Sequence, residues 1–157
     1  MSNDGLVPTP PLKEHVTDLT GTLTTQEKDE LNSILSKFEK QKGSQIAVLI
    51  IPTTKPEEIE KYSLRVANQW GLGRKDINDG VLLLIAKDDR RLRIEVGLGL
   101  EDALSNTVAK DIIDKTIVPY FKNGDFYNGI KAGLKDIIKV VDNKPPPPLG
   151  IIQEIAR

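Results

Sequence analysis

Apolar residues follow two different periods along this chain, and the short continuous apolar runs predict the strands of a sheet. Gln45–Ile51 and residues 81–86 are apolar at almost every position, which is typical of strands buried on both faces. Residues 92–96 instead alternate between apolar and charged side chains. They predict a half-exposed strand that returns antiparallel to residues 81–86 as a hairpin. A short fourth strand is expected near residues 15–17.

Longer segments with apolar residues at helical spacing predict a first and a last helix. The first begins with a capping box, in which Thr24 caps the helix and Glu27 reaches back to it. Gly43 is placed to end this helix in a left-handed conformation. The last helix begins near Phe126 and keeps an apolar face as far as Val141.

Two further helices are predicted between these. Thr54 and Glu57 also have the spacing of a capping box, so we expect a helix to open there. Ser105 is expected to cap another helix, and Pro119 to end it because proline does not continue a helix.

The predicted order is typical of an α/β domain. Gln45–Ile51 and residues 81–86 are joined through a helix, so these strands should lie parallel, with a right-handed crossover. Helices are therefore expected on both faces of a small mixed sheet of about four strands.

Proline-containing segments bound the predicted domain, which we place at residues 16–143. Residues 1–15 form an N-terminal arm, and residues 144–157 form a proline-rich tail whose four consecutive prolines predict a stiff spacer. The sequence leaves open whether residues 149–157 are a foreign remnant, a truncated neighbour or a small docking helix.

Composition excludes several kinds of chemistry. The chain has no cysteine and a single histidine, His15, so thiolate nucleophiles, disulfides and sites with several histidines are excluded within one chain. Lysine and arginine number 22 against 23 aspartate and glutamate, for a net charge of −1. Because this balance gives no basic field, we expect no nucleic-acid partner. Any reaction must use carboxylates, hydroxyls, amines, backbone groups or a hard cation.

Oxygen-bearing side chains gather in two loops that the topology should bring together. Asp76, Asn78 and Asp79 precede one strand of the predicted hairpin, and Glu101 and Asp102 follow the other. The start of one hairpin strand lies beside the end of its partner, so these residues are expected at one edge of the sheet. Ca²⁺ takes six to eight oxygen ligands, so this set predicts a hard-cation site.

A structural explanation of the same residues remains open. Aspartate, asparagine and glycine are ordinary turn formers, and Asp102 has a position that favours a helix N-terminus. Asp18 precedes the first helix and should lie at the opposite edge, so we expect it to bond loop N–H groups as an Asx-turn.

Several short motifs together resemble the TPM domain, a family named in part after a chloroplast thylakoid lumen protein. The resemblance covers about residues 16–141. The motifs that carry it are residues 16–18 (VTD), 45–48 (QIAV), 70–73 (WGLG), 78–84 (NDGVLLL), 93–101 (RIEVGLGLE) and 118–126 (VPYFKNGDF).

The resemblance implies a three-layer α/β/α sandwich that associates with divalent cations, notably calcium, and a phosphatase activity attributed to plant relatives. Asp79 and Glu101 match motif positions of the family. Bacterial relatives are often exported or tethered beside a membrane. Residues 1–11 show no signal-peptide pattern, and the sequence has no apolar run of the roughly 18–20 residues that a membrane span needs, so we expect a soluble protein without a signal peptide. Either it is a stand-alone or trimmed domain, or its location differs from theirs.

Three functions follow as hypotheses. The first is a calcium-binding regulatory or assembly domain, which we expect to be a monomer and whose cation pins residues 71–80 to residues 97–102. The second is a metal-assisted phosphatase of phosphate monoesters, with Arg74 and Lys75 nearest for phosphate charge and no nucleophile assigned. The third is a protein-interaction module of a membrane-associated complex, which docks through residues 145–157 without a metal.

Overall fold

A mixed four-stranded sheet forms the centre of the molecule. The structure, a computed structural model, describes residues 5–142. The strands β1 (Val16–Asp18), β2 (Gln45–Ile51), β3 (Gly80–Ala86) and β4 (Arg91–Val96) lie in this order across the sheet. β2 and β3 are parallel, and β4 returns antiparallel to β3, as the sequence predicted. β1 pairs with β2 and is also parallel to it.

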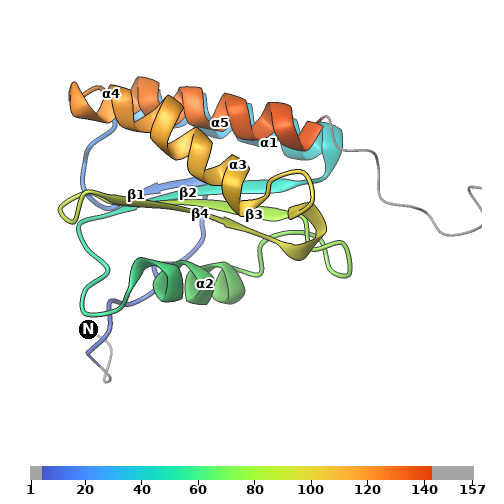
Figure 1. Cartoon of the computed structure of the whole chain (residues 1–157), viewed down its shortest axis with the longest axis horizontal. Helices are drawn as coiled ribbons and strands as arrows, with labels where there is room; N and C mark the ends of the chain where they lie inside the picture. Colours follow the sequence, from blue (N-terminus) through green and yellow to red (C-terminus); the bar gives the residue numbers. More distant parts are fainter. Residues whose placement is uncertain (1–4, 143–157) are drawn as a thin grey trace, which may run out of the picture.

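Helices cover both faces of the sheet, which makes the three-layer α/β/α sandwich that was expected (Figure 1). One layer contains α1 (Thr25–Lys42), α3 (Asn106–Asp111), α4 (Val118–Lys122) and α5 (Phe126–Asp142). The opposite layer contains α2 (Ile59–Trp70). Among the described residues, no helix combines the length and the apolar character that a membrane crossing requires.

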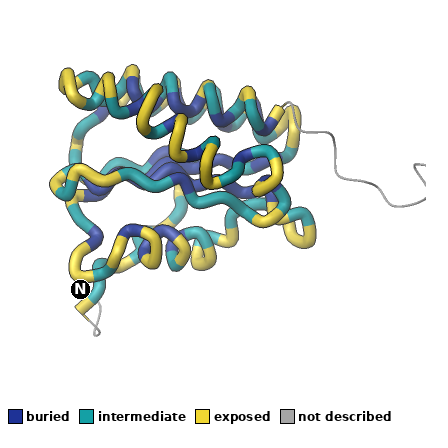
Figure 2. The backbone as a smooth tube through the Cα atoms, in the orientation of Figure 1, coloured by how far each residue is buried: buried dark blue, intermediate teal, exposed yellow. Residues whose placement is uncertain are grey.

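The core explains why the two central strands are apolar at consecutive positions. Side chains that alternate along a strand point to opposite faces, so a strand covered on both sides needs apolar residues at every position. In β3, Leu83 and Ile85 pack toward α1 and α5, whereas Leu82 and Leu84 pack toward α2. Figure 2 shows this buried sheet centre between more exposed helices.

The first helix begins and ends as predicted. The Oγ1 of Thr24 accepts a hydrogen bond from the Glu27 N–H at 3.0 Å, and Glu27 Oε1 accepts one from the Thr24 N–H at 2.9 Å. Gly43 follows the helix with a φ of 87°, the left-handed conformation that glycine adopts without strain.

The predicted capping box at Thr54 is wrong. α2 begins at Ile59 instead, because the Thr54 hydroxyl donates to the Glu57 carbonyl at 3.0 Å and so forms a turn. The Thr54 N–H donates to Asp89 at 3.2 Å, a contact across the fold that local spacing does not reveal.

The predicted end of the third helix at Pro119 is also wrong. Ser105 does cap α3, and its hydroxyl accepts a hydrogen bond from the Val108 N–H at 3.2 Å. The chain then continues through a π-helical segment, η2 (Ile112–Ile117), directly into α4. Pro119 is the second residue of α4, so it lies inside this continuous helical run and does not end it.

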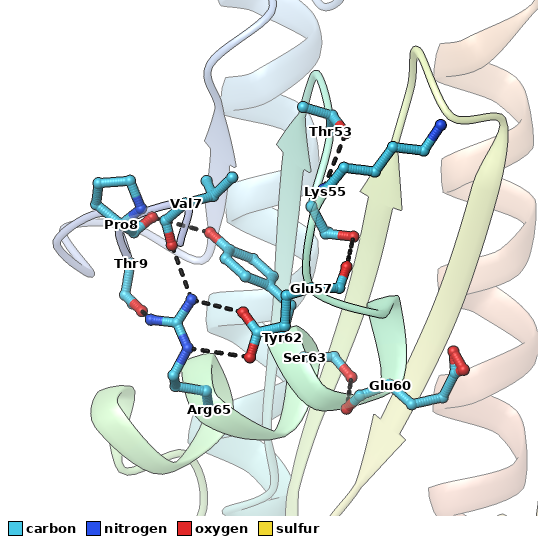
Figure 3. A network of polar contacts seen from close by, with 11 residues as sticks. Val7, Pro8, Thr9, Thr53, Lys55, Glu57, Glu60, Tyr62, Ser63 and Arg65 are labelled. Carbon is cyan, nitrogen blue, oxygen red and sulfur yellow. Dashed lines mark hydrogen bonds and ion pairs between the residues drawn. The ribbon is translucent and has the colours of Figure 1, made fainter. Parts of the chain in front are cut away.

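The N-terminal arm lies against α2 (Figure 3). The Tyr62 hydroxyl donates to the Pro8 carbonyl at 3.0 Å, and Arg65 donates to the Val7 carbonyl at 2.8 Å. Arg65 also pairs with Glu57 at 2.8 Å. Burial raises the pKa of Tyr62 to about 12, so the phenol remains a neutral hydrogen-bond donor.

Candidate functional site

The two loops that carry the predicted ligands lie together, as the hairpin topology required. We call residues 71–80 and 97–102 the acidic edge; they occupy one end of the sheet in Figure 1. The Gly97 N–H donates to the Gly80 carbonyl at 2.8 Å, and the Gly99 N–H donates to the Asn78 carbonyl at 2.9 Å. These backbone hydrogen bonds continue the β3–β4 pairing beyond its last residue pair, Val81 and Val96.

Glycine is required at two positions of this contact. A Cβ atom on Gly99 would lie 1.9 Å from the Ile77 carbonyl oxygen, and one on Gly97 would lie 2.3 Å from the Asn78 carbonyl oxygen. Both neighbours are backbone atoms, which cannot swing aside as a long side chain does. The glycines therefore allow the close approach of the two loops.

Asp79 is buried in this edge and already has a cationic partner. Its carboxylate accepts hydrogen bonds from the Arg74 side chain at 2.6 Å and 2.9 Å and from the Arg74 N–H at 2.8 Å. The Ser44 hydroxyl donates to the same carboxylate at 3.2 Å. The Asp79 side chain is 2% exposed, whereas that of Arg74 is 46% exposed.

The same contacts keep Asp79 ionised. Burial by itself acts to raise the pKa of Asp79, but the hydrogen bonds and positive charge of Arg74, together with the Ser44 hydroxyl, outweigh burial. The result is a pKa below the ordinary value of 3.8. Arg74, one of the two cations considered for binding phosphate, thus has its guanidinium directed at this carboxylate.

The other four predicted ligands are exposed. Asp76 and Asn78 both have left-handed backbone, with φ values of 69° and 55°, and Glu101 and Asp102 follow the short 3₁₀ turn η1 (Leu98–Leu100). Within residues 5–142, no three carboxylate, histidine or cysteine side chains converge closely enough to hold one ion between them. The fold thus brings the loops together without bringing all the predicted carboxylates into contact.

A cavity of about 370 Å³ receives side chains from both loops. Asn78 and Glu101 line it, and so does Glu95 from β4. Sequence reasoning missed Glu95, because alternation with apolar residues marked it only as a surface position. Its register opposite Leu82 and its place two residues before Gly97 were signals that it lies beside this edge. Glu95 accepts a hydrogen bond from the Ser63 hydroxyl at 2.9 Å.

Asp18 lies at the other end of the sheet and organises the loop before α1, as expected. One carboxylate oxygen accepts the Thr20 N–H at 2.9 Å, and the other accepts the Leu23 N–H at 2.8 Å. Burial acts to raise the pKa of Asp18, but these hydrogen bonds, with one from the Thr20 hydroxyl, hold it below its ordinary value. The Asx-turn that was expected at this position is confirmed.

Comparison with solved structures supports the fold. The N-terminal domain of a protein from P. gingivalis is 31% identical and has a TM-score of 0.76, with 82% of each chain covered. The BA42 protein of the psychrophilic bacterium Bizionia argentinensis is 21% identical, with a TM-score of 0.68, over 83% of this chain and 89% of that one. An N-terminal domain from Corynebacterium glutamicum is 13% identical, with a TM-score of 0.65, over 90% and 91% of the two chains.

Sequence comparison identifies the family. A search of the curated proteins found no match. The family model of the TPM domain matches residues 16–140, which span the sheet and nearly all of the helices described above. The match begins at β1 and ends within α5, so it takes in both loops of the acidic edge. This chain belongs to the TPM domain family.

Proposed function

We propose that this chain is a divalent-cation-binding TPM domain, and that calcium binds at the acidic edge and pins its two loops together. The observation that carries the proposal is the cavity lined by Asn78, Glu95 and Glu101, because it places oxygen-bearing side chains from both loops on one space. Oxygen donors suit a hard cation such as Ca²⁺. In this role the ion stabilises the joined loops and so presents a defined surface for regulation or assembly.

The candidate ligands fall into two groups, which differ in whether their oxygens are already hydrogen-bonded. Asp76, Asn78, Glu101 and Asp102 are exposed, so their oxygens are accessible to an ion. Asp79 is different, since its oxygens already accept the hydrogen bonds of Arg74 and Ser44. Asp79 would become a ligand only after the Arg74 guanidinium leaves it, and the exposed position of Arg74 leaves solvent available to that group.

Calcium titration of the full chain, followed by amide chemical shifts, tests the proposal. We expect shifts at the amides of residues 76–80 and 97–102. Glu101→Gln should weaken binding about tenfold, because a charged ligand becomes a neutral one. Asp111→Asn is the matched control, because Asp111 is an exposed carboxylate on α3, outside these loops, and its loss should change the affinity by less than about twofold.

Absence of shifts in these loops at about 10 mM Ca²⁺, beyond the affinity of the weakest natural calcium modules, would falsify the proposal. Equal weakening by Glu101→Gln and Asp111→Asn would also contradict it, because a diffuse surface charge would then explain the binding. Arg74→Gln tests whether Asp79 is a ligand. Tighter calcium binding in this variant indicates that Asp79 binds the ion once Arg74 no longer occupies it. Unchanged calcium affinity indicates that only the exposed residues are ligands.

A further inference from the structure

A second cavity lies at the opposite edge of the sheet from the proposed calcium site. It measures about 810 Å³ and lies between the turn that joins β3 to β4 and the junction of α4 with α5. In Figure 1 both features lie at the end of the molecule where β3 finishes. The carboxyl ends of parallel strands are a common location of ligand sites in α/β sheets, and this volume is within the range of small-molecule pockets. We call it the basic cavity.

Positive charge dominates the lining of the basic cavity. Lys87, Arg90, Arg91 and Lys122 line it, against one carboxylate, Asp88. Asp89, the next residue of the hairpin turn, does not line this cavity.

That neighbouring carboxylate, Asp89, has its partners on the far side of the turn. It accepts hydrogen bonds from the Thr53 hydroxyl at 2.8 Å and 2.9 Å and from the Thr54 N–H at 3.2 Å, and Lys55 lies 3.7 Å away. Asp89 does not line the basic cavity. Its negative charge is therefore committed to the loop before α2. Arg91 lies 3.9 Å from Glu60, so the lining cations without a carboxylate partner are Lys87, Arg90 and Lys122.

One of these cations is held in place by two contacts. The Lys87 ammonium donates to the Thr22 hydroxyl at 2.9 Å and lies 4.8 Å from the centre of the Phe126 ring. An ammonium group has three N–H donors, so two remain for a ligand. The Lys87 N–H donates to the Ile51 carbonyl at 2.9 Å, which ties the base of this side chain to the end of β2.

Two other cations are unengaged. Among residues 5–142, the side chains of Arg90 and Lys122 have no hydrogen-bond or ion-pair partner. Both are exposed, so they cost little to reorient toward a ligand.

The remaining walls of the cavity are apolar. Leu92, Val118, Phe121 and Phe126 line it. The rings of Phe121 and Phe126 lie 4.9 Å apart, centre to centre, and are tilted by 58°, so the two aromatic side chains support each other. A ligand that fills this space meets an apolar surface and a set of N–H donors together.

We propose that the basic cavity binds a small amphipathic anion, which has one phosphate, phosphonate or carboxylate head and one apolar or aromatic group. The head accepts hydrogen bonds from Lys87 and Lys122, and the apolar group lies against Val118 and Phe121. This site is separate from the acidic edge and does not depend on calcium. It differs from a general anion site because burial of the apolar group also contributes to recognition.

Titration of the full chain with three probes tests the proposal. Phenylphosphonate has both parts of the ligand, inorganic phosphate has only the head, and benzyl alcohol has only the aromatic group. We expect phenylphosphonate to shift the amides of residues 87–92 and 118–126, with an affinity about tenfold above that of either partial probe.

Three variants complete the test. Lys87→Met and Lys122→Met keep an unbranched side chain but remove the charge, and each should weaken phenylphosphonate about tenfold. Lys122 has no partner among the described residues, so its variant keeps the fold even if Lys87→Met loses stability. Lys110→Met is the matched control: Lys110 is an exposed lysine on α3 that does not line the basic cavity, and its variant should leave the affinity within about twofold of the parent protein.

Three outcomes overturn the proposal. The first is an absence of shifts in residues 87–92 and 118–126 with phenylphosphonate at about 10 mM, far above the concentrations at which specific sites fill. The second is an equal affinity for inorganic phosphate and phenylphosphonate, which indicates a charge effect alone. The third is equal weakening by Lys110→Met and Lys122→Met. None of these outcomes bears on calcium binding, which is measured at the other edge.

Discussion

The two edges of the sheet differ in how they are built. At the acidic edge, backbone meets backbone: glycines 97 and 99 pack against the carbonyls of Ile77 and Asn78, and exposed oxygen-bearing side chains surround the contact. At the basic cavity, helices and hairpin stand apart and side chains line the space between them. A net charge of −1 hides this separation. The comparison teaches that a balanced composition says little about local fields, because charge acts over about 8–10 Å at physiological salt.

The close backbone contact between Gly99 and Ile77 joins the two loops of the acidic edge, and we expect Gly99→Ala to disrupt it with the largest loss of stability among these predictions. A Cβ at this position would lie 1.9 Å from the Ile77 carbonyl oxygen, so the loops must separate. We expect a loss of about 3 kcal/mol in the free energy of unfolding, measured by urea denaturation.

Gly124→Ala is the control for this variant at the other edge. Gly124 also has a positive φ, 76°, but a Cβ there would meet no atom within 4 Å. It should cost only about 1 kcal/mol, the strain of a left-handed residue. If the two variants cost the same, close backbone approach does not distinguish the acidic edge.

The ion pair beneath the acidic edge gives the next largest effect. Asp79→Asn removes the charge that Arg74 and Ser44 surround, and we expect a loss of about 2 kcal/mol at pH 7, because hydrogen bonds to a charged group are replaced by weaker or mismatched ones. Urea denaturation of the parent protein and the variant at several pH values measures the difference.

The difference in the free energy of unfolding between the parent protein and Asp79→Asn should depend on pH. The pKa of Asp79 is lower in the folded protein than its ordinary value of 3.8, so its stabilising contribution is fully present above pH 3.8. The contribution is lost as the pH falls below that value toward the folded pKa. Asp18 and Asp89 have lowered pKa values in both proteins, so their contributions cancel in the comparison. A difference that stays constant down to about pH 2 would contradict this assignment.

The smallest effect concerns the support of the basic cavity. Thr22→Val removes the oxygen that accepts the Lys87 ammonium at 2.9 Å. We expect a loss of about 1 kcal/mol in stability and about threefold in phenylphosphonate affinity, because Lys87 then samples more conformations. Thr107→Val, an exposed threonine on α3, is the control and should change neither quantity measurably. Unchanged affinity in Thr22→Val would mean that Thr22 does not position Lys87.

Local signals predicted the first helix and the strands well, and failed where distant residues compete for the same groups. The capping box of Thr24 and Glu27 formed because both partners belong to one turn. The similar pair at Thr54 did not cap a helix, because Asp89 binds the backbone of Thr54 from across the fold. Identical spacing therefore led to different structures.

The candidate site divides in the same way. Hairpin geometry is local, so the sequence predicted that residues 71–80 and 97–102 would lie side by side. The partner of Asp79 was not predictable from spacing alone, because Arg74 is one of several cations nearby in sequence and the loop conformation selects among them. Glu95 was missed since alternation describes which face a residue occupies and not which cavity that face borders.

By itself, the sequence determined the order of helices and strands, the apolar faces that bury the sheet and the absence of thiolate chemistry, because periodicity and composition act through short-range geometry and residue type. Only the tertiary structure decided which charges are paired and which remain available. It directs Arg74 to Asp79 and Asp89 away from the basic cavity, and it gathers Lys87 and Lys122 from segments far apart along the chain. Such pairing depends on distances of a few ångströms between separate elements, which no pattern along one segment contains.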